Sequence, residues 1–423
     1  MKWWGVAVLM LCIPAILATH WITFPLGTDL QGMGFSIFAY APNHQHLVVF
    51  SFGVIASLML ALAAFACACD KPTGLYWAGS AMLLVVLWSW LRISVLDPGL
   101  LIELARQSET RRAVDGYAVR YLAPNYAIEP TVWLTIAFDT VADRLIAGWY
   151  FMALGWYIVG GFGAGLWFAG IKMTGGRDAF RPALIAVIVA VAVITLAVVH
   201  PLMAEREISA AARADARGDI RTAVADYRAA MRLDGWYAAN LRIYQRIGAL
   251  DASMGRNATP EYAIYYAEQL AAQNVAPATI GELPAAIAIY ERLGAGTSRL
   301  SALARMRAAD LLARYGLHLQ QCGAFGAAVQ AWERALKLRP DMWLASFYLS
   351  NGYQIAGRYQ DAANAAARLT ASSDPSFLGH DYSNLGDANF RNGNFAAGHV
   401  DYYNSYYLDY IFNRRGMSSL IGP

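Results

Sequence analysis

Apolar runs and short amphipathic helices divide this chain into two parts. In the first part, five stretches carry almost no charge and are close to the ~20 residues that a helix needs to cross a bilayer. They cover roughly residues 3–22, 46–69, 75–92, 145–171 and 182–203. After residue 204, apolar positions recur at helical spacing among charged ones, which predicts amphipathic helices. The pattern predicts an all-α protein with a five-helix transmembrane bundle at residues 1–203, a helical domain at 204–410 and a tail at 411–423.

A repeat with a period near 34 residues organises the second part. Gly323 is followed by Gly357 after 34 residues and by Gly393 after 36 more. A fixed period of this length is typical of stacked helix pairs, each too small to bury its own apolar face. The sequence therefore predicts an α-solenoid of four to six repeats.

These units resemble the tetratricopeptide repeat (TPR) family in their pattern of small and aromatic residues. The matching positions are Tyr315, Gly316, Gly323, Phe325, Ala328, Trp332, Ala335 and Pro340, then Leu349, Tyr353, Gly357, Tyr359 and Ala362, then Tyr382, Leu385, Gly386, Gly393 and Phe395. Gly218, Ile220, Ala223, Tyr227 and Ala230 continue the pattern directly after the fifth apolar run. The aromatic residues Phe325, Trp332, Tyr359 and Phe395 are expected in the core.

The resemblance implies a scaffold that binds a partner protein in a concave groove lined by the first helix of each pair. Transferred to this chain, the groove positions are Leu317, Gln320, Phe347, Asn351, Gln354, His380, Ser383, Asp387, Phe390 and Arg391. Asn351 and Arg391 would hold a carboxylate or a peptide backbone, and Phe347 and Phe390 would pack against side chains. The alternative is a solvated groove without a partner.

Tyrosines give one face of the C-terminal helix an aromatic character. They are Tyr402, Tyr403, Tyr406, Tyr407 and Tyr410. Such a helix either caps the last repeat or forms a second protein interface, because tyrosine is favoured at interfaces.

The basic residues of the short loops predict the orientation in the membrane. Lys2, Lys71, Lys172, Arg177 and Arg181 fall on one side, and the loop after the first run has no Lys or Arg. The longer loop up to Arg144 carries arginines and weakens this argument. We expect a cytoplasmic N-terminus and, after five spans, a periplasmic repeat domain in a bacterial inner membrane. No flexible linker separates the fifth run from the repeats, so one helix should continue between them.

Composition narrows the possible functions. With 57% apolar and 15% charged residues, the chain is too apolar for an ordinary soluble protein. A net charge of +3 without a basic cluster argues against nucleic-acid binding, and we expect no cofactor. Gly161 and Gly165 form a GxxxG step, which predicts close packing against another helix in lipid.

Histidines near the predicted outer surface suggest a metal site. His20, His44, His46 and His200 lie in or beside the outer loops, with Asp29 and Asp97 nearby in the predicted topology. Imidazole and carboxylate ligands suit zinc, copper or iron. The alternative is a set of interfacial histidines that bind water and headgroups.

No sequence motif points to an enzyme, since GxSxG, HExxH and Walker motifs are absent. Asp139, Asp143 and Arg144 lie at a predicted membrane boundary, where charges are usually solvated or paired. The sequence therefore favours a scaffold or assembly subunit of a membrane complex. The alternative is a membrane enzyme or enzyme accessory that acts on a lipid-linked or exported substrate through the loops at 20–45 and 97–144.

Overall fold

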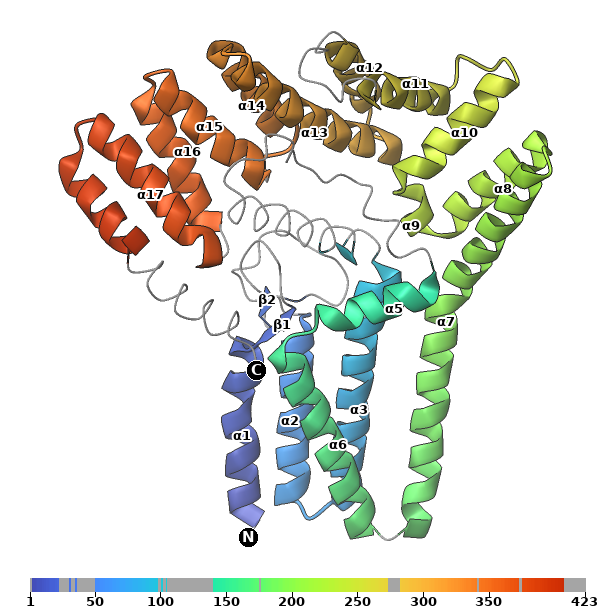
Figure 1. The fold of residues 1–423 in the computed structure, drawn as a ribbon. Coiled ribbons are helices and arrows are strands. Elements are labelled where there is room, and N and C mark those ends of the chain that lie inside the picture. Colours follow the sequence, from blue (N-terminus) through green and yellow to red (C-terminus); the bar gives the residue numbers. More distant parts are fainter. Residues whose placement is uncertain are drawn as a thin grey trace, which may run out of the picture.

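The computed structural model describes residues 2–22, 30, 31, 35, 50–97, 100, 101, 104, 140–174, 176–272, 282–340, 342–372 and 375–406. Within these residues the fold is all-α apart from one antiparallel pair of strands, β1 (His20–Ile22) and β2 (Leu30–Gln31). Long helices stand side by side at one end of the molecule, and shorter helices form an arch above them (Figure 1).

The helices at the lower end of Figure 1 correspond to the apolar runs. They are α1 (Lys2–Ala18), α2 (Phe52–Ala68), α3 (Pro72–Leu91) with its π-helical extension η1 (Arg92–Leu96), α6 (Leu154–Thr174) and α7 (Gly176–Ala216). Among the described residues, three segments are long and apolar enough to cross a membrane: Pro72–Leu96, Leu154–Thr174 and Leu184–Ala216. The apolar parts of α1 and α2 are shorter. A bundle of five spans is therefore not confirmed.

The helix expected over residues 145–171 is in fact two helices. The short helix α5 (Val141–Tyr150) lies across the top of the bundle, and α6 descends from Leu154 (Figure 1). Contacts with β1 stabilise the break, because the Ala153 amide donates to the Trp21 carbonyl at 3.0 Å and Met152 forms a bridge with Ile22. No glycine or proline lies between Tyr150 and Leu154, although Gly155 follows directly and lets the start of α6 approach Thr19 and His20.

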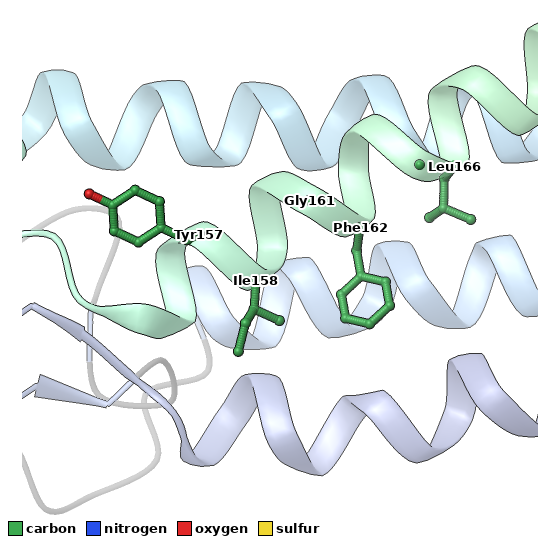
Figure 2. A pocket seen from close by; sticks show the side chains of 6 residues that line it. Tyr157, Ile158, Gly161, Phe162 and Leu166 are labelled. Atoms are coloured by element: carbon green, nitrogen blue, oxygen red, sulfur yellow. The ribbon is translucent and has the colours of Figure 1, made fainter.

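Glycines allow α3 and α6 to approach closely, but they are not the predicted pair. A Cβ added at Gly163 would lie 3.2 Å from Met82 and Leu83 of α3. Gly161 and Gly165 have nothing within 4 Å of such an atom, so the predicted GxxxG contact is absent from the described chain. They instead line an open groove of about 440 Å³, beside the side chains of Ile158 and Phe162 in Figure 2.

Helix α7 joins the bundle to the arch. It runs for 41 residues without a break, from the apolar segment into the first repeat, as the sequence predicts. The shorter helices then follow in order: α8 (Ile220–Leu233), α9 (Gly235–Ala238), α10 (Leu241–Ser253), α11 (Pro260–Ala272), α12 (Leu283–Gly294), α13 (Arg299–Gln321), α14 (Phe325–Leu338), α15 (Trp343–Ile355), α16 (Tyr359–Ser372) and α17 (Pro375–Arg391). Residues 395–406 are helical as well.

Glycines in the left-handed region mark the turns inside the helix pairs. Gly218, Gly255, Gly323, Gly357 and Gly393 have φ between +72° and +81°, a conformation that residues with a Cβ rarely adopt. They join α7 to α8, α10 to α11, α13 to α14, α15 to α16, and α17 to the helix at 395–406. The described residues thus contain five helix pairs, within the predicted range, and α12 stands between the second and third.

The best-defined pair shows why small residues recur. The Trp332 side chain of α14 is 1% exposed and packs over Gly316 of α13, where an added Cβ would lie 2.4 Å from its Nε1 atom. Trp332 also donates to the Ala313 carbonyl at 3.1 Å. The expectation that Phe325 and Phe395 are core residues is wrong, since they are 37% and 61% exposed. Each is the first residue of the second helix of its pair, and the first buried residue of that helix comes three positions later.

Candidate functional site

The junction between the bundle and the arch contains a buried ion pair. Arg144 of α5 is completely buried, and its Nη1 atom lies 2.7 Å from Oδ2 of Asp234, which separates α8 from α9. The guanidinium also lies 5.5 Å from the ring centroid of Trp236 and 5.7 Å from that of Tyr237. A buried arginine with a carboxylate and two aromatic rings can hold two elements in one orientation.

Several further contacts fix α5 above the bundle. Thr140 and Asp143 form a capping box at its N-terminus. The Val141 amide donates to Glu205 of α7 at 3.1 Å, and the Trp90 indole of α3 donates to the Leu145 carbonyl at 3.0 Å. α5 is therefore bonded to α3 below and to α7 beside it, which positions Arg144 toward the first repeat.

The apolar core is continuous across this junction. One cluster of buried side chains includes Met82 and Ile93 from the lower helices, Ala204 from α7, and Trp236 and Ile247 from the arch. Because interiors are closely packed, such a core resists movement of one part against the other. The core and the ion pair together fix the first part of the arch, from α7 to α10, against the bundle.

Arginine–carboxylate pairs link neighbouring units along the arch. They are Arg246–Asp215 (2.6 Å), Arg228–Glu261 (3.1 Å), Arg307–Glu268 (2.7 Å), Arg334–Glu291 (2.7 Å) and Arg358–Glu333 (3.1 Å). Exposed pairs such as Arg334–Glu291 contribute ~0–1 kcal/mol each. The series of pairs matters more than the energy of any one pair, because each pair helps to fix the relative placement of two adjacent units.

The Arg307–Glu268 pair is the most deeply buried of these links. Two nitrogens of Arg307 donate to the two carboxylate oxygens of Glu268 at 2.7 and 2.9 Å, and the Tyr290 hydroxyl donates to the same group at 2.6 Å. Burial, with Glu268 next to it, raises the pKa of Tyr290 well above its usual value. The three side chains connect α11, α12 and α13, which explains how the solitary helix α12 fits into the stack.

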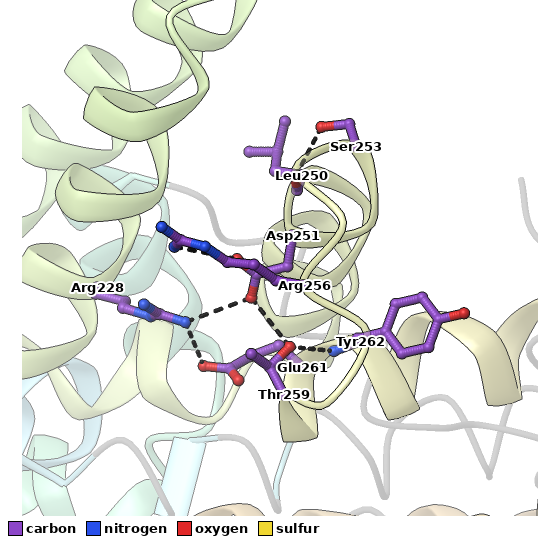
Figure 3. Close-up of polar contacts among 8 residues, drawn as sticks. All are labelled: Arg228, Leu250, Asp251, Ser253, Arg256, Thr259, Glu261 and Tyr262. Carbon is purple, nitrogen blue, oxygen red and sulfur yellow. Dashed lines mark hydrogen bonds and ion pairs between the residues drawn. The ribbon is translucent and has the colours of Figure 1, made fainter.

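A second polar network holds an atypical turn between α10 and α11 (Figure 3). The Asp251 carboxylate is fully buried and accepts a hydrogen bond from Thr259 at 3.0 Å. Arg228 of α8 lies 3.5 Å from Asp251 and 3.1 Å from Glu261. This turn is longer than the other four, and the network supplies contacts that keep it against α8.

The predicted groove residues lie on three first helices, as the repeat resemblance implies. Leu317 and Gln320 belong to α13, Phe347, Asn351 and Gln354 to α15, and His380, Ser383, Asp387, Phe390 and Arg391 to α17. Arg391 is exposed, and the others are half-buried except His380, whose side chain lies outside the described residues. Gln354 donates to the Asn384 carbonyl at 3.3 Å, so α15 and α17 meet at this surface.

Two of the predicted groove residues are engaged within their own helix pair. Asp387 accepts a hydrogen bond from the Tyr402 hydroxyl, which raises the pKa of Tyr402 to about 12. The Phe390 ring lies 4.9 Å from His399 and 5.3 Å from Tyr402. Both side chains hold the helix at 395–406 in place. Asn351, Gln354 and Arg391 are therefore the better groove candidates.

The C-terminal tyrosines have two different environments. Tyr402 packs against Gly386 and Phe390, which fits the role of a second helix that closes the last pair. Tyr403 and Tyr406 are 67% and 72% exposed, so a protein interface at this end stays a prediction. Tyr407 and Tyr410 lie outside the described residues.

The predicted metal site is not assembled by the described residues. His20 begins β1 and His200 lies in α7, and both are exposed. Among the residues searched, no group of three or more His, Cys, Asp or Glu side chains could hold a metal ion. His44 and His46 lie outside the described residues, so the prediction that involves them is untested.

Sequence reasoning missed the Arg144–Asp234 pair. The sequence showed Arg144 as a charge at a predicted membrane boundary, where pairing is common. Its partner is 90 residues away, and no periodicity links the two positions. Arg144 also retains buried Nε and Nη2 atoms without a hydrogen-bond partner among the described residues, so the pair is not fully satisfied.

Comparisons with known proteins give structural likenesses only. No family model and no curated protein matches the sequence. The solved structures that match include MamA (16% identity, 48% of this chain and 96% of that one, TM-score 0.26), a tetratricopeptide repeat protein from Parabacteroides merdae (19%, 47% and 77%, 0.20) and the TPR domain of P58(IPK) (14%, 83% and 92%, 0.24). The helix pairs and their glycine turns are the basis for describing the array as TPR-like.

Proposed function

We propose that this protein is a membrane-anchored scaffold, whose TPR-like array holds a partner protein at the outer face of a bacterial inner membrane as part of a larger complex. The observation that carries the proposal is the rigid junction. Helix α7 runs unbroken into the array, and Arg144 and Asp234 form a buried pair across the same boundary. A flexible tether would need none of these contacts.

The arrangement of the two ends supports the proposed orientation. The start of α1, the end of α6 and the start of α7 lie at the end of the bundle away from the array (Figure 1). The basic residues Lys2, Lys71 and Lys172 belong to that end. Since basic loops favour the cytoplasm, the array would lie on the periplasmic side.

Two native cysteines provide a test of this orientation. Cys69 follows α2 at the basic end, Cys322 lies in the turn between α13 and α14, and both are exposed. In a variant with Cys12→Ala and Cys67→Ala, a membrane-impermeant maleimide should label Cys322 in spheroplasts and should label Cys69 only after the membrane is disrupted. Labelling of Cys69 alone in spheroplasts would reverse the topology.

The partner would bind the surface where α15 and α17 meet. Asn351 and Gln354 can bond a peptide backbone, and Arg391 is an exposed cation at its edge. Affinity purification in mild detergent, followed by quantitative mass spectrometry, should recover a stoichiometric partner. The variant Asn351→Ala with Arg391→Glu should lose it.

The matched control changes the same residue types at exposed turns far from α15. It combines Asn257→Ala with Arg217→Glu. Full recovery of the partner by the control and little by the groove variant supports the proposal. Equal recovery by both variants rules out this surface, and purification without any stoichiometric partner argues against a scaffold.

A further inference from the structure

A second groove lies on the last repeats, where α16, α17 and the helix at 395–406 meet. It has a volume of about 540 Å³ and its floor includes Leu385 and Asn389 of α17. One wall is a face of α16 with Ala363 and Ala367, and the other is the helix at 395–406 with Ala396 and Val400. Alanines occur on both walls, beside Gln360 and Asn364 of α16, and they leave room for a bulky side chain from elsewhere.

An acidic group lines this largely apolar groove. Asp401 is 7% exposed and accepts a hydrogen bond from Asn389 at 2.7 Å. No cation pairs with it among the described residues, in contrast to the carboxylates that link the units of the array. Burial raises the pKa of Asp401, since its negative charge is partly removed from water, and the hydrogen bond from Asn389 offsets only part of this effect.

A carboxylate so little exposed, with no cation beside it among the described residues, is unfavourable without a partner charge. A lysine or arginine at this position would supply the missing charge, while apolar atoms beside it would cover the alanines and Val400. We propose that this outer groove binds a basic side chain carried on a short apolar segment of a partner protein. The groove does not share residues with the surface between α15 and α17, so the two sites are independent.

The lining of the groove agrees with this occupant, because it combines apolar side chains with one carboxylate. A lysine or arginine stem is itself apolar and lies along hydrophobic surface while its head meets a charge. Asn389 holds one oxygen of Asp401 in place. The carboxylate is therefore oriented before the partner arrives, which reduces the entropy lost on binding.

A selection from a random library of short peptides displayed on phage tests the proposal. The full-length protein in nanodiscs serves as the target, and binders to the variant Ala396→Trp are removed, because this exposed groove position would then be filled. The selected peptides should share one lysine or arginine flanked by apolar residues. A selection that yields no groove-dependent peptide, or only peptides without a basic residue, overturns the proposal.

Charge specificity is then measured with a selected peptide and a twin in which norleucine replaces the lysine. The twin should bind wild type about tenfold more weakly or worse, and Asp401→Asn should weaken the lysine peptide by a similar factor. The control Asp361→Asn removes an exposed carboxylate of α16 that already pairs with Arg358, so it should change nothing. A lysine preference that survives Asp401→Asn contradicts the proposal, whereas loss of the α15–α17 partner would leave this result unaffected.

Discussion

Four arginines of the described chain are less than 9% exposed, and three of them, Arg144, Arg307 and Arg339, contact a carboxylate of another segment. Removing a guanidinium from water is unfavourable unless an opposite charge and hydrogen bonds replace the lost hydration. These pairs therefore select one arrangement of the helices more than they add stability. Arg144 matters most, because it lies where the bundle meets the array.

Removing the charge of Arg144 should destabilise the junction. Arg144→Ala leaves Asp234 buried without a partner, and we expect a loss of about 3–5 kcal/mol in the free energy of unfolding. Thermal unfolding in detergent, followed by tryptophan fluorescence, measures this loss. The double variant Arg144→Met with Asp234→Asn should recover part of it, whereas a single variant as stable as wild type would show that the pair does not fix the junction.

Removing the charge of Asp401 should stabilise the protein at neutral pH, in contrast to removing the charge of Arg144. Its pKa is raised in the folded protein above the usual 3.8, so the folded state binds more protons and its stability falls as pH rises through this window. Asp401→Asn should raise the melting temperature at pH 7 by about 1–3 °C, and the gain should shrink toward pH 4. A lower melting temperature at pH 7 would mean that the carboxylate is already compensated.

At the scale of elements, the array could be predicted more fully than the bundle. The turns inside the helix pairs need a positive φ, and each is therefore occupied by a glycine. The spacing of these glycines can be read from the sequence, and it predicts the helix pairs. The break between α5 and α6 could not be seen, because Tyr150 to Leu154 are all compatible with a helix. A tertiary contact stops the helix there, through the bond from Ala153 to Trp21.

Only part of the candidate sites could be predicted from the sequence. The resemblance placed Asn351 and Gln354 on one first helix, α15, and Arg391 on the next, α17. It could not show that Asp387 and Phe390 are held by the next helix, since that depends on the rotation of α17 about its axis. The outer groove at Asp401 had no sequence signal, because it arises where three helices meet.

Two glycines of one helix pair give a matched test of the packing. Gly316 faces Trp332, so Gly316→Val should overpack the pair and destabilise the array by about 1–3 kcal/mol or more. Gly326 of α14 faces open space, and Gly326→Ala should be neutral or stabilising by up to about 1 kcal/mol through helix propensity. Chemical unfolding of the two variants measures both effects. Similar stabilities would contradict the close approach at Gly316.

At the scale of the whole molecule, the account depends on a fixed relation between the bundle and the array. The continuous α7, the shared apolar core and the Arg144–Asp234 pair all act across one boundary. A fixed array would present its binding surfaces at a constant height and direction above the membrane. A rigid scaffold would therefore fix the position and orientation of a bound partner. A flexible tether would only keep the partner near the membrane.

The distance between Cys69 and Cys322 tests this claim most directly. Both side chains are exposed, one at the end of α2 and one within the array, and the half-buried Cys12 and Cys67 can be changed to alanine. Spin labels on the remaining pair, measured by pulsed electron–electron double resonance in nanodiscs, should give one narrow distance distribution that broadens in Arg144→Ala. A broad or multiple distribution in the protein with Arg144 intact would contradict the rigid junction.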